Sequence, residues 1–164
     1  MVLSKLHREI LHNQYLILQA LYPKDKSNAQ KADAIYNGYS REYENWMKEM
    51  PEETPLELCG EVIDILDMYR MIGNAVPKEG DAGINPDHTV FQGFDGNEEG
   101  DHYSYAKFVL DSGKFREANG GPNSHTPTLP KYRDMLQAWR AMEDRHNLSL
   151  EQAMELIAMA PRRF

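Results

Sequence analysis

The chain has 164 residues, of which 41% are hydrophobic, and a formal net charge of -8. This length suits one domain with a core of its own, which argues against a disulfide-stapled miniprotein and against a disordered chain. A single cysteine, no charged-then-apolar leader and no long apolar run predict a cytoplasmic protein with no membrane partner.

Acidic charge is concentrated in the middle of the chain. Residues 42–101 carry 16 acidic and 3 basic residues, whereas basic residues are in excess elsewhere. Such a block repels phosphate, so nucleic acid is not the expected partner.

The first predicted helix covers residues 2–21 and carries one apolar stripe, made up of Leu3, Leu6, Ile10, Ile17 and Leu21. Asn13 and Gln14 interrupt this stripe, because both project within about 60° of its centre. An unpaired buried amide costs about 1–3 kcal/mol, so we expect both amides to be buried and to bind loop backbone, each other or a ligand.

The next helical segment begins with a possible capping box, Ser27 with Gln30, and reaches Gly38. Helical spacing then resumes at Tyr39 and continues to Pro51. The join at Gly38 is therefore predicted to be a kink or a break.

A central helix is predicted over residues 54–72, with Thr54 as N-cap, Pro55 at the first helical position and Glu57 completing a capping box. It is apolar on nearly every side, which is typical of a helix sandwiched between other elements or shared with a second subunit. The side opposite its main apolar stripe is predicted to be a solvated or interfacial acidic face, formed by Glu57, Glu61, Asp64 and Asp67.

The rest of the chain alternates helices with loops rich in glycine and proline. Residues 73–96 form a long loop with a short extended or helical piece at 89–91, and residues 116–130 form a second loop. Helices are predicted at 97–113 and 129–145, and a last one opens with the box Ser149 to Gln152 and ends before Pro161. No segment alternates like a strand, so we predict an all-α, single-domain bundle of about six helices over residues 1–164.

Three Glu-x-x-His pairs raise the question of a metal, since this spacing occurs in di-metal helix bundles. They are Glu9 with His12, Glu99 with His102, and Glu143 with His146. The first pair lies away from its helix's apolar stripe, the second lies in a first turn, and His146 lies near a helix end. We therefore expect neither a metal nor a cofactor.

Several separated segments resemble the YfbU family, an uncharacterised protein family of bacteria, over nearly the whole chain. The segments are HNQYLILQALYP (12–23), VIDILDMYRMI (62–72), TVFQGFD (89–95) and HTPTLPKYRDMLQAW (125–139). The resemblance implies a small, cytosolic, helical bacterial protein and brings no assigned activity with it. The matching positions include Asn13, Gln14, Tyr15, Asp64, Met68, Tyr69, Phe91, Gly93, Phe94, Asp95, Thr126, Pro127, Tyr132, Met135, Leu136 and Trp139.

The favoured function is a non-enzymatic interaction or regulatory module that binds a protein partner or a small effector. We expect a homo-oligomer, most simply a dimer, formed through the second apolar face of the central helix. The expected ligand site joins residues of the first helix to residues of the two loops: Asn13, Gln14, Tyr15, Phe94, Asp95, Thr126 and Pro127.

Two other functions remain open. The first is a hydrolase or nuclease that uses His125, the histidine of the second loop, with Asp95, Asp64 or Asp67. The second is nucleic-acid binding by the basic flanks, through Arg133, Arg140, Arg145, Arg162 and Arg163. The absence of the familiar nucleotide-binding and nucleophile motifs favours a protein without enzymatic activity but leaves catalysis open.

Overall fold

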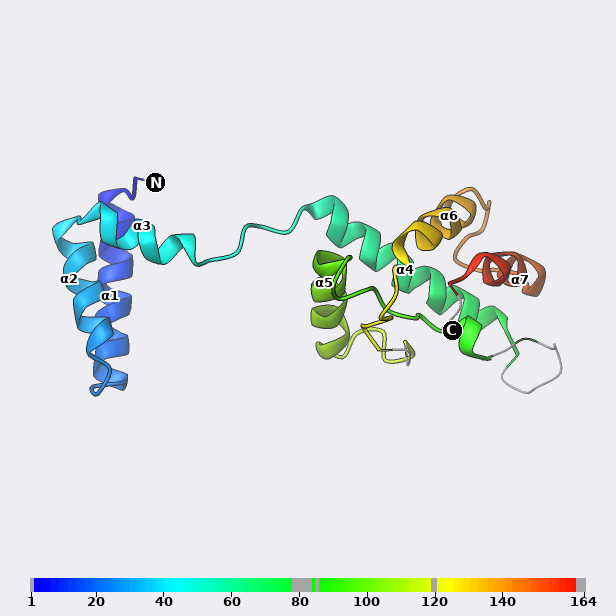
Figure 1. The fold of residues 1–164 in the computed structure, drawn as a ribbon, viewed down its shortest axis with the longest axis horizontal. Helices are drawn as coiled ribbons and strands as arrows, with labels where there is room; N and C mark the ends of the chain where they lie inside the picture. Colours follow the sequence, from blue (N-terminus) through cyan, green and yellow to red (C-terminus); the bar gives the residue numbers. More distant parts are fainter. Residues whose placement is uncertain (1, 78–83, 85, 119–120, 162–164) are drawn as a thin grey trace. The chain divides into compact units, whose positions relative to one another are not determined.

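A computed structural model describes residues 2–77, 84, 86–118 and 121–161. The described residues form seven α-helices, one short 3-10 turn and no strand, which confirms the predicted all-α class (Figure 1). The elements are α1 (Lys5–Leu21), α2 (Lys26–Asn37), α3 (Ser40–Lys48), α4 (Leu56–Ala75), η1 (Pro86–Thr89), α5 (Gly100–Asp111), α6 (Leu129–Arg140) and α7 (Leu150–Met159).

The helices are distributed over two compact units. Unit 1 spans Met1–Glu53 and unit 2 spans Thr54–Phe164. Residues 50–57, which include the boundary, are all exposed to solvent. The two units are described separately below.

Unit 1 is a helical hairpin of α1 and α2, followed by the short helix α3. Ser4 caps α1 by accepting a hydrogen bond from the backbone N–H of His7. Asp25, and not the predicted Ser27, caps α2, because its carboxylate accepts from the Ser27 N–H. Gly38 then ends α2 in the left-handed conformation, so the predicted join is a break and the helix count exceeds six.

Unit 2 is built around α4, which contacts α5, α6, α7 and η1. Its buried residues, among them Ile65 and Met68, lie along one broad face of the helix. Outside that face, Ile63 and Met71 are partly buried. Oligomerisation through the second apolar face of α4 stays a prediction. The predicted cap at Thr54 is not made, because Pro55 occupies the N-cap position and no side chain caps the helix.

The core of unit 2 contains a group of aromatic rings brought together by α4, α6 and the segment after η1. The ring of Tyr132 lies 5.6 Å from those of Tyr69 and Phe91 and 5.5 Å from that of Phe94, centroid to centroid. Aromatic pairs at these distances contribute stability beyond the area that they bury. The short extended or helical piece predicted at 89–91 corresponds to the end of η1 and the start of a buried segment that runs directly into the core.

The predictions for the last three helices differ in accuracy. The capping box of α7 is confirmed, because Ser149 and Gln152 exchange side-chain and backbone hydrogen bonds. In contrast, α6 ends at Arg140 and not near Arg145, and α5 starts at Gly100 and not near Asn97.

None of the helices among the described residues has the length and apolar character needed to cross a membrane.

Candidate functional site

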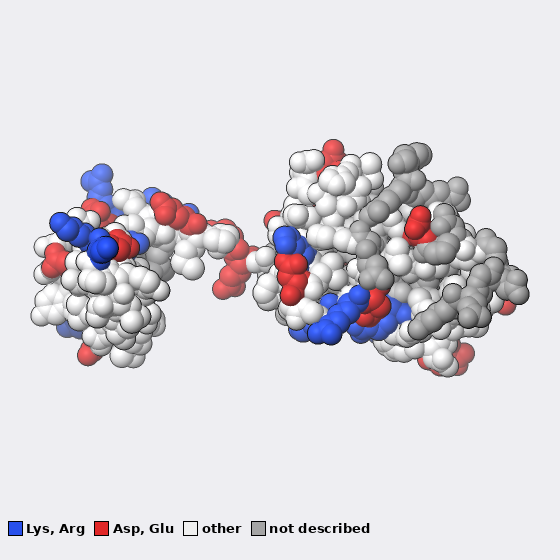
Figure 2. Space-filling view, turned by 90° about the horizontal axis from the view of Figure 1, so that it is seen from below, with Lys and Arg blue, Asp and Glu red and all other residues white. Residues whose placement is uncertain are grey.

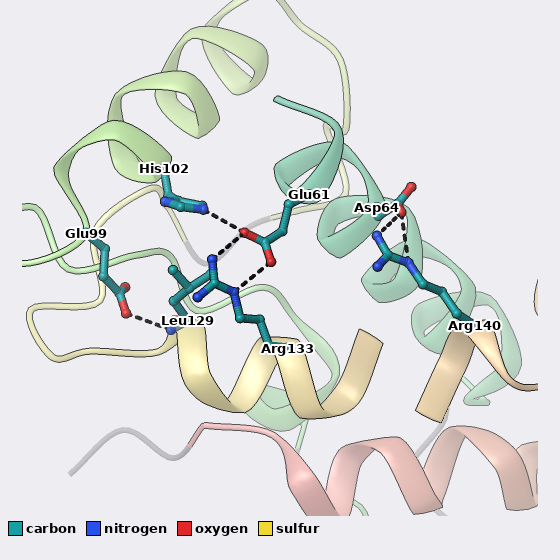
Figure 3. A network of polar contacts seen from close by, with 7 residues as sticks. All are labelled: Glu61, Asp64, Glu99, His102, Leu129, Arg133 and Arg140. Carbon is teal, nitrogen blue, oxygen red and sulfur yellow. Dashed lines mark hydrogen bonds and ion pairs between the residues drawn. The ribbon is translucent and has the colours of Figure 1, made fainter. Parts of the chain in front are cut away.

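The acidic side of α4 faces basic residues of α6 (Figure 3). Glu61 and Asp64 are three residues apart on α4, and Arg133 and Arg140 are seven apart on α6, so each pair lies on one helix face. Glu61 binds Arg133, and Asp64 binds Arg140. Two of the four residues of the predicted acidic face are thus paired with α6, whereas Asp67 binds Arg70 of the same helix and Glu57 is exposed.

Glu61 is held by two partners at once. The Arg133 Nε donates to Oε1 at 2.8 Å, and a terminal nitrogen of the same guanidinium donates to Oε2 at 3.0 Å. The Nε2 of His102, on α5, lies 2.8 Å from Oε2 and must carry the hydrogen, because an ionised carboxylate can only accept. The Arg133 hydrogen bonds hold the pKa of Glu61 below its usual range, partial burial opposes them, and His102 adds to the lowering.

Glu99 occupies the buried centre of a second set of hydrogen bonds, at the start of α5. One carboxylate oxygen accepts from the backbone N–H groups of Thr128 and Leu129 at 2.8 and 2.7 Å. The other accepts from the Asp95 N–H at 2.8 Å and the Thr128 hydroxyl at 3.1 Å. This carboxylate joins the first turn of α6 to the loop before α5, a role that stabilises the fold.

A surface pocket of about 520 Å3 opens beside Glu61. It is lined by Pro55, Glu57, Leu58, Glu61, His102, Arg133 and Arg140. Among these lining residues none carries a hydroxyl or a thiol, and the lowered pKa of Glu61 makes it a weak proton acceptor near neutral pH. Charged side chains and the imidazole of His102 thus line this pocket.

The loop residues predicted for the ligand site do come together within unit 2. Phe94 and Asn123 form an isolated parallel bridge, so the segment before α5 lies against the loop that precedes α6. Phe94 is fully buried in the aromatic core, and Asp95, also buried, accepts a hydrogen bond from the Asn97 N–H at 2.8 Å. Thr126 and Pro127 are exposed. Two of the four loop residues therefore act in folding.

The prediction that Asn13 and Gln14 are buried is wrong, since both are exposed on α1. Tyr15 is partly buried and packs edge-on against Trp46, with ring centroids 6.4 Å apart. Asn13 also lines a pocket of about 330 Å3 between α1 and α2, together with Lys5, Arg8, Glu9, His12 and Tyr36. The helical periodicity placed the amides on the right face, but that face is open.

The open face of α1 is apolar. Leu6, Ile10, Ile17 and Leu21 are 64%, 57%, 55% and 66% exposed, and no residue of α1 is buried. The opposite side of the helix, which includes His12 and Leu18, packs against α2. We call the four aliphatic residues and the two amides between them the α1 stripe.

The histidines do not form a metal site in the part of the chain that the structure describes, where no three His, Cys, Asp or Glu residues converge. The Nδ1 of His12 donates to the Ala32 carbonyl at 3.0 Å, and the ring of His146 packs edge-on against Trp139. His125 is exposed with a positive φ of 58°, and its backbone N–H donates to the Asn123 side chain. A catalytic role for His125 stays a prediction.

The basic residues predicted to bind nucleic acid are in part already paired. Arg133 and Arg140 bind carboxylates, and the Arg145 guanidinium lies over the Trp139 ring at 5.1 Å. Arg162 and Arg163 lie outside the described residues. On the face of unit 2 seen in Figure 2, basic and acidic side chains are likewise intermixed.

Sequence reasoning missed the Glu61 network because its members come from α4, α5 and α6. The one local signal was the Glu99 and His102 spacing, and those two residues use different partners. A long-range pair such as Glu61 and His102, 41 residues apart, leaves no periodic trace in the sequence.

Comparison with known proteins places this helical architecture in a family. The chain is 28% identical over 171 residues to the "UPF0304 protein MJECS11" of Methanocaldococcus jannaschii, which covers 95% of this chain and 99% of that protein. It is 28% identical over 165 residues to a "UPF0304 protein" of Histophilus somni, which covers 96% and 99%. The family model described as the YfbU domain matches residues 1–159. The chain therefore belongs to the YfbU domain family.

Proposed function

We propose that this protein is a non-enzymatic, cytoplasmic interaction module with a regulatory role, and that unit 1 binds a helix of a protein partner through the α1 stripe. The observation that carries the proposal is that every large aliphatic side chain of the stripe is more than half exposed. Apolar surface gathered on one helix face and rimmed by polar residues is typical of protein interaction sites.

Burying the stripe would release a large free energy for so small a unit. Full burial of a leucine or isoleucine side chain is worth about 1.5–3 kcal/mol, so covering the exposed part of four of them is worth about 4–7 kcal/mol. The described core of unit 1 consists only of Asn28, Ala32, Ala34, Ile35 and Tyr43. A unit of this size seldom stabilises itself with so few buried residues, which supports a partner that completes the core.

The Glu61 network supports the non-enzymatic character. Both oxygens of Glu61 are hydrogen-bonded, and Asp64 is bound to Arg140. Residues that serve as general bases usually have a pKa raised toward neutrality, whereas the pKa of Glu61 is lowered.

A photo-crosslinking residue introduced at position 10 or 17 tests the proposed function in cells. We expect each to form a crosslink to one defined helical peptide, identified by mass spectrometry, and we expect the crosslink to disappear when Leu6→Asp is added. The same residue at Phe108, which is 68% exposed on α5, serves as control and should give no such product. Crosslinks equally frequent at all three positions, or none at 10 and 17, would refute a partner at the α1 stripe.

A small effector is the second candidate, favoured by the pocket beside Glu61. The pocket combines the exposed carboxylate of Glu57 with the guanidinium groups of Arg133 and Arg140, whose side chains are 57% and 47% exposed. A ligand with both an ammonium and a carboxylate group would match these charges. Native mass spectrometry of the freshly purified protein would detect it as a retained small mass, which Arg133→Gln should abolish. Retention of that mass by the Arg133→Gln variant would contradict this candidate.

A further inference from the structure

The positions of the residues in the α1 stripe are symmetric about the bond between Asn13 and Gln14. Ile10 precedes Asn13 by three positions, and Ile17 follows Gln14 by three. Leu6 precedes Asn13 by seven positions, and Leu21 follows Gln14 by seven. A surface with this symmetry is complementary to a second copy of itself that runs in the opposite direction.

We propose that the partner of the α1 stripe is a second copy of this chain, and that the two α1 helices pack antiparallel about a two-fold axis that passes between Asn13 and Gln14. This inference rests on the proposed function and specifies its partner. In this arrangement Ile10 of one copy lies level with Ile17 of the other, and Leu6 lies level with Leu21.

The two-fold axis also accounts for the exposed amides. Asn13 and Gln14 project to opposite edges of the stripe, about 100° apart around the helix. The axis brings each residue beside the same residue of the other copy, Asn13 on one edge and Gln14 on the other. A carboxamide has both a donor and an acceptor, so two identical ones can pair reciprocally. Shifting the helices would place the amides against Ile10 or Ile17, where they would lose these partners, so the amides select one register.

The charges of α1 permit two copies to meet. No residue of α1 within about 60° of the stripe's centre is charged, so the pairing brings no like charges together. Lys5, Arg8 and Glu9 line the pocket beside Asn13 and provide a polar rim. The 17 residues of α1 give a contact about 25 Å long, which suits an interface at the small end of the stable range.

Disulfide trapping tests the arrangement in the full chain with Cys59→Ala. We expect no disulfide-linked dimer from Ile10→Cys alone or from Ile17→Cys alone, and a linked dimer when the two variants are mixed and oxidised. In the proposed dimer the two copies of position 10 are about 10 Å apart along the helices, too far for a disulfide, whereas positions 10 and 17 are level. Tyr36→Cys, at a residue 70% exposed on α2, should not link to either variant. Self-linking of each variant alone would show parallel pairing and would overturn the inference.

A charge exchange at the axis provides the second test. Asn13→Lys and Asn13→Glu should each be monomeric, because the axis places two like charges together, and an equimolar mixture should form heterodimers. The same substitutions at Gln19, on the side of α1 away from the stripe, should leave the dimer intact.

The mass of the wild-type protein in solution tests the homodimer without any substitution. We expect a dimer by sedimentation at concentrations from about 1 to 100 µM. A monomer throughout this range would overturn the homodimer. In that case crosslinks from positions 10 and 17 to a different protein would still uphold the proposed function, and their absence would refute it as well.

Discussion

At the scale of single residues, the Glu61 ion pair makes a testable contribution to stability. Glu61→Gln should lower the free energy of unfolding by about 1–2 kcal/mol at pH 7, because Arg133 and His102 lose their charged acceptor. Urea unfolding followed by circular dichroism measures this loss. Glu57→Gln, one turn earlier and exposed, is the matched control and should change stability by less than about 0.5 kcal/mol.

The same variant should also alter the pH dependence of stability. Since the pKa of Glu61 is lower in the folded state than in the unfolded state, the unfolded chain binds more protons as the pH falls. The stabilisation is therefore present above the unfolded pKa of about 4.3 and is lost as the pH falls through the folded pKa. The difference between wild type and Glu61→Gln should shrink when unfolding is measured near pH 3 instead of pH 7. A difference independent of pH would show that packing, and not charge, causes the loss.

Glu99 should be the more sensitive residue. Glu99→Gln turns one carboxylate oxygen into a donor, which would face either the N–H groups of Thr128 and Leu129 or the N–H group of Asp95. We therefore expect a loss of about 2–3 kcal/mol. The neighbouring Glu98 is exposed, and Glu98→Gln should be almost neutral in the same thermal or urea unfolding assay. Equal effects of the two substitutions would contradict the buried role of Glu99.

At the scale of elements, two glycines should respond to alanine in opposite directions. Gly93 has a φ of 89°, and a Cβ there would meet the Pro122 backbone at 2.6 Å, so Gly93→Ala should separate the paired loops and cost more than about 2 kcal/mol. Gly73 lies inside α4 with no atom within 4 Å of an added Cβ. Gly73→Ala should therefore stabilise the protein by about 0.5–1 kcal/mol. Thermal unfolding measures both, and a stable Gly93→Ala variant would refute the required close approach.

How far the sequence predicts each element depends on how local the determining interactions are. The Ser149 and Gln152 box was predicted correctly because its partners are three residues apart on one helix. The cap of α2 was misplaced because Asp25 and Ser27 are both suitable cap residues, and the sequence alone does not rank them. Likewise, α4 lacks the predicted Thr54 cap because the chain reaches it through Pro55 in an extended conformation.

The candidate site shows the same division between local and long-range information. Periodicity correctly placed Asn13 and Gln14 among the aliphatic residues of one face, but it contains no information on what covers that face. Both α1 and α4 carry apolar residues at helical spacing, yet six residues of α4 are buried and none of α1 is. The bonds from Glu99 to Thr128 and from Glu61 to Arg133 depend on the tertiary fold.

At the scale of the whole molecule, each unit contains one of the two tryptophans, Trp46 in unit 1 and Trp139 in unit 2. Trp139 is 1% exposed, within a core cluster whose members all belong to unit 2. Trp46 is half-buried and packs against Tyr15, the residue that follows the α1 stripe amides. Fluorine NMR of the protein labelled with 5-fluorotryptophan can therefore follow the unfolding of each unit in one sample.

If unit 1 completes its core by pairing with a second copy, only its stability should depend on protein concentration. A tenfold increase in concentration should raise the midpoint reported by Trp46 by about 5 °C and leave the midpoint reported by Trp139 unchanged. Trp46→Phe assigns the two resonances. With Ile10→Asp added, the Trp46 midpoint should fall and lose its concentration dependence, because an aspartate in the α1 stripe opposes pairing without touching unit 2. A single transition for both tryptophans, unaffected by concentration, would contradict both the independent unfolding of unit 2 and the pairing of unit 1.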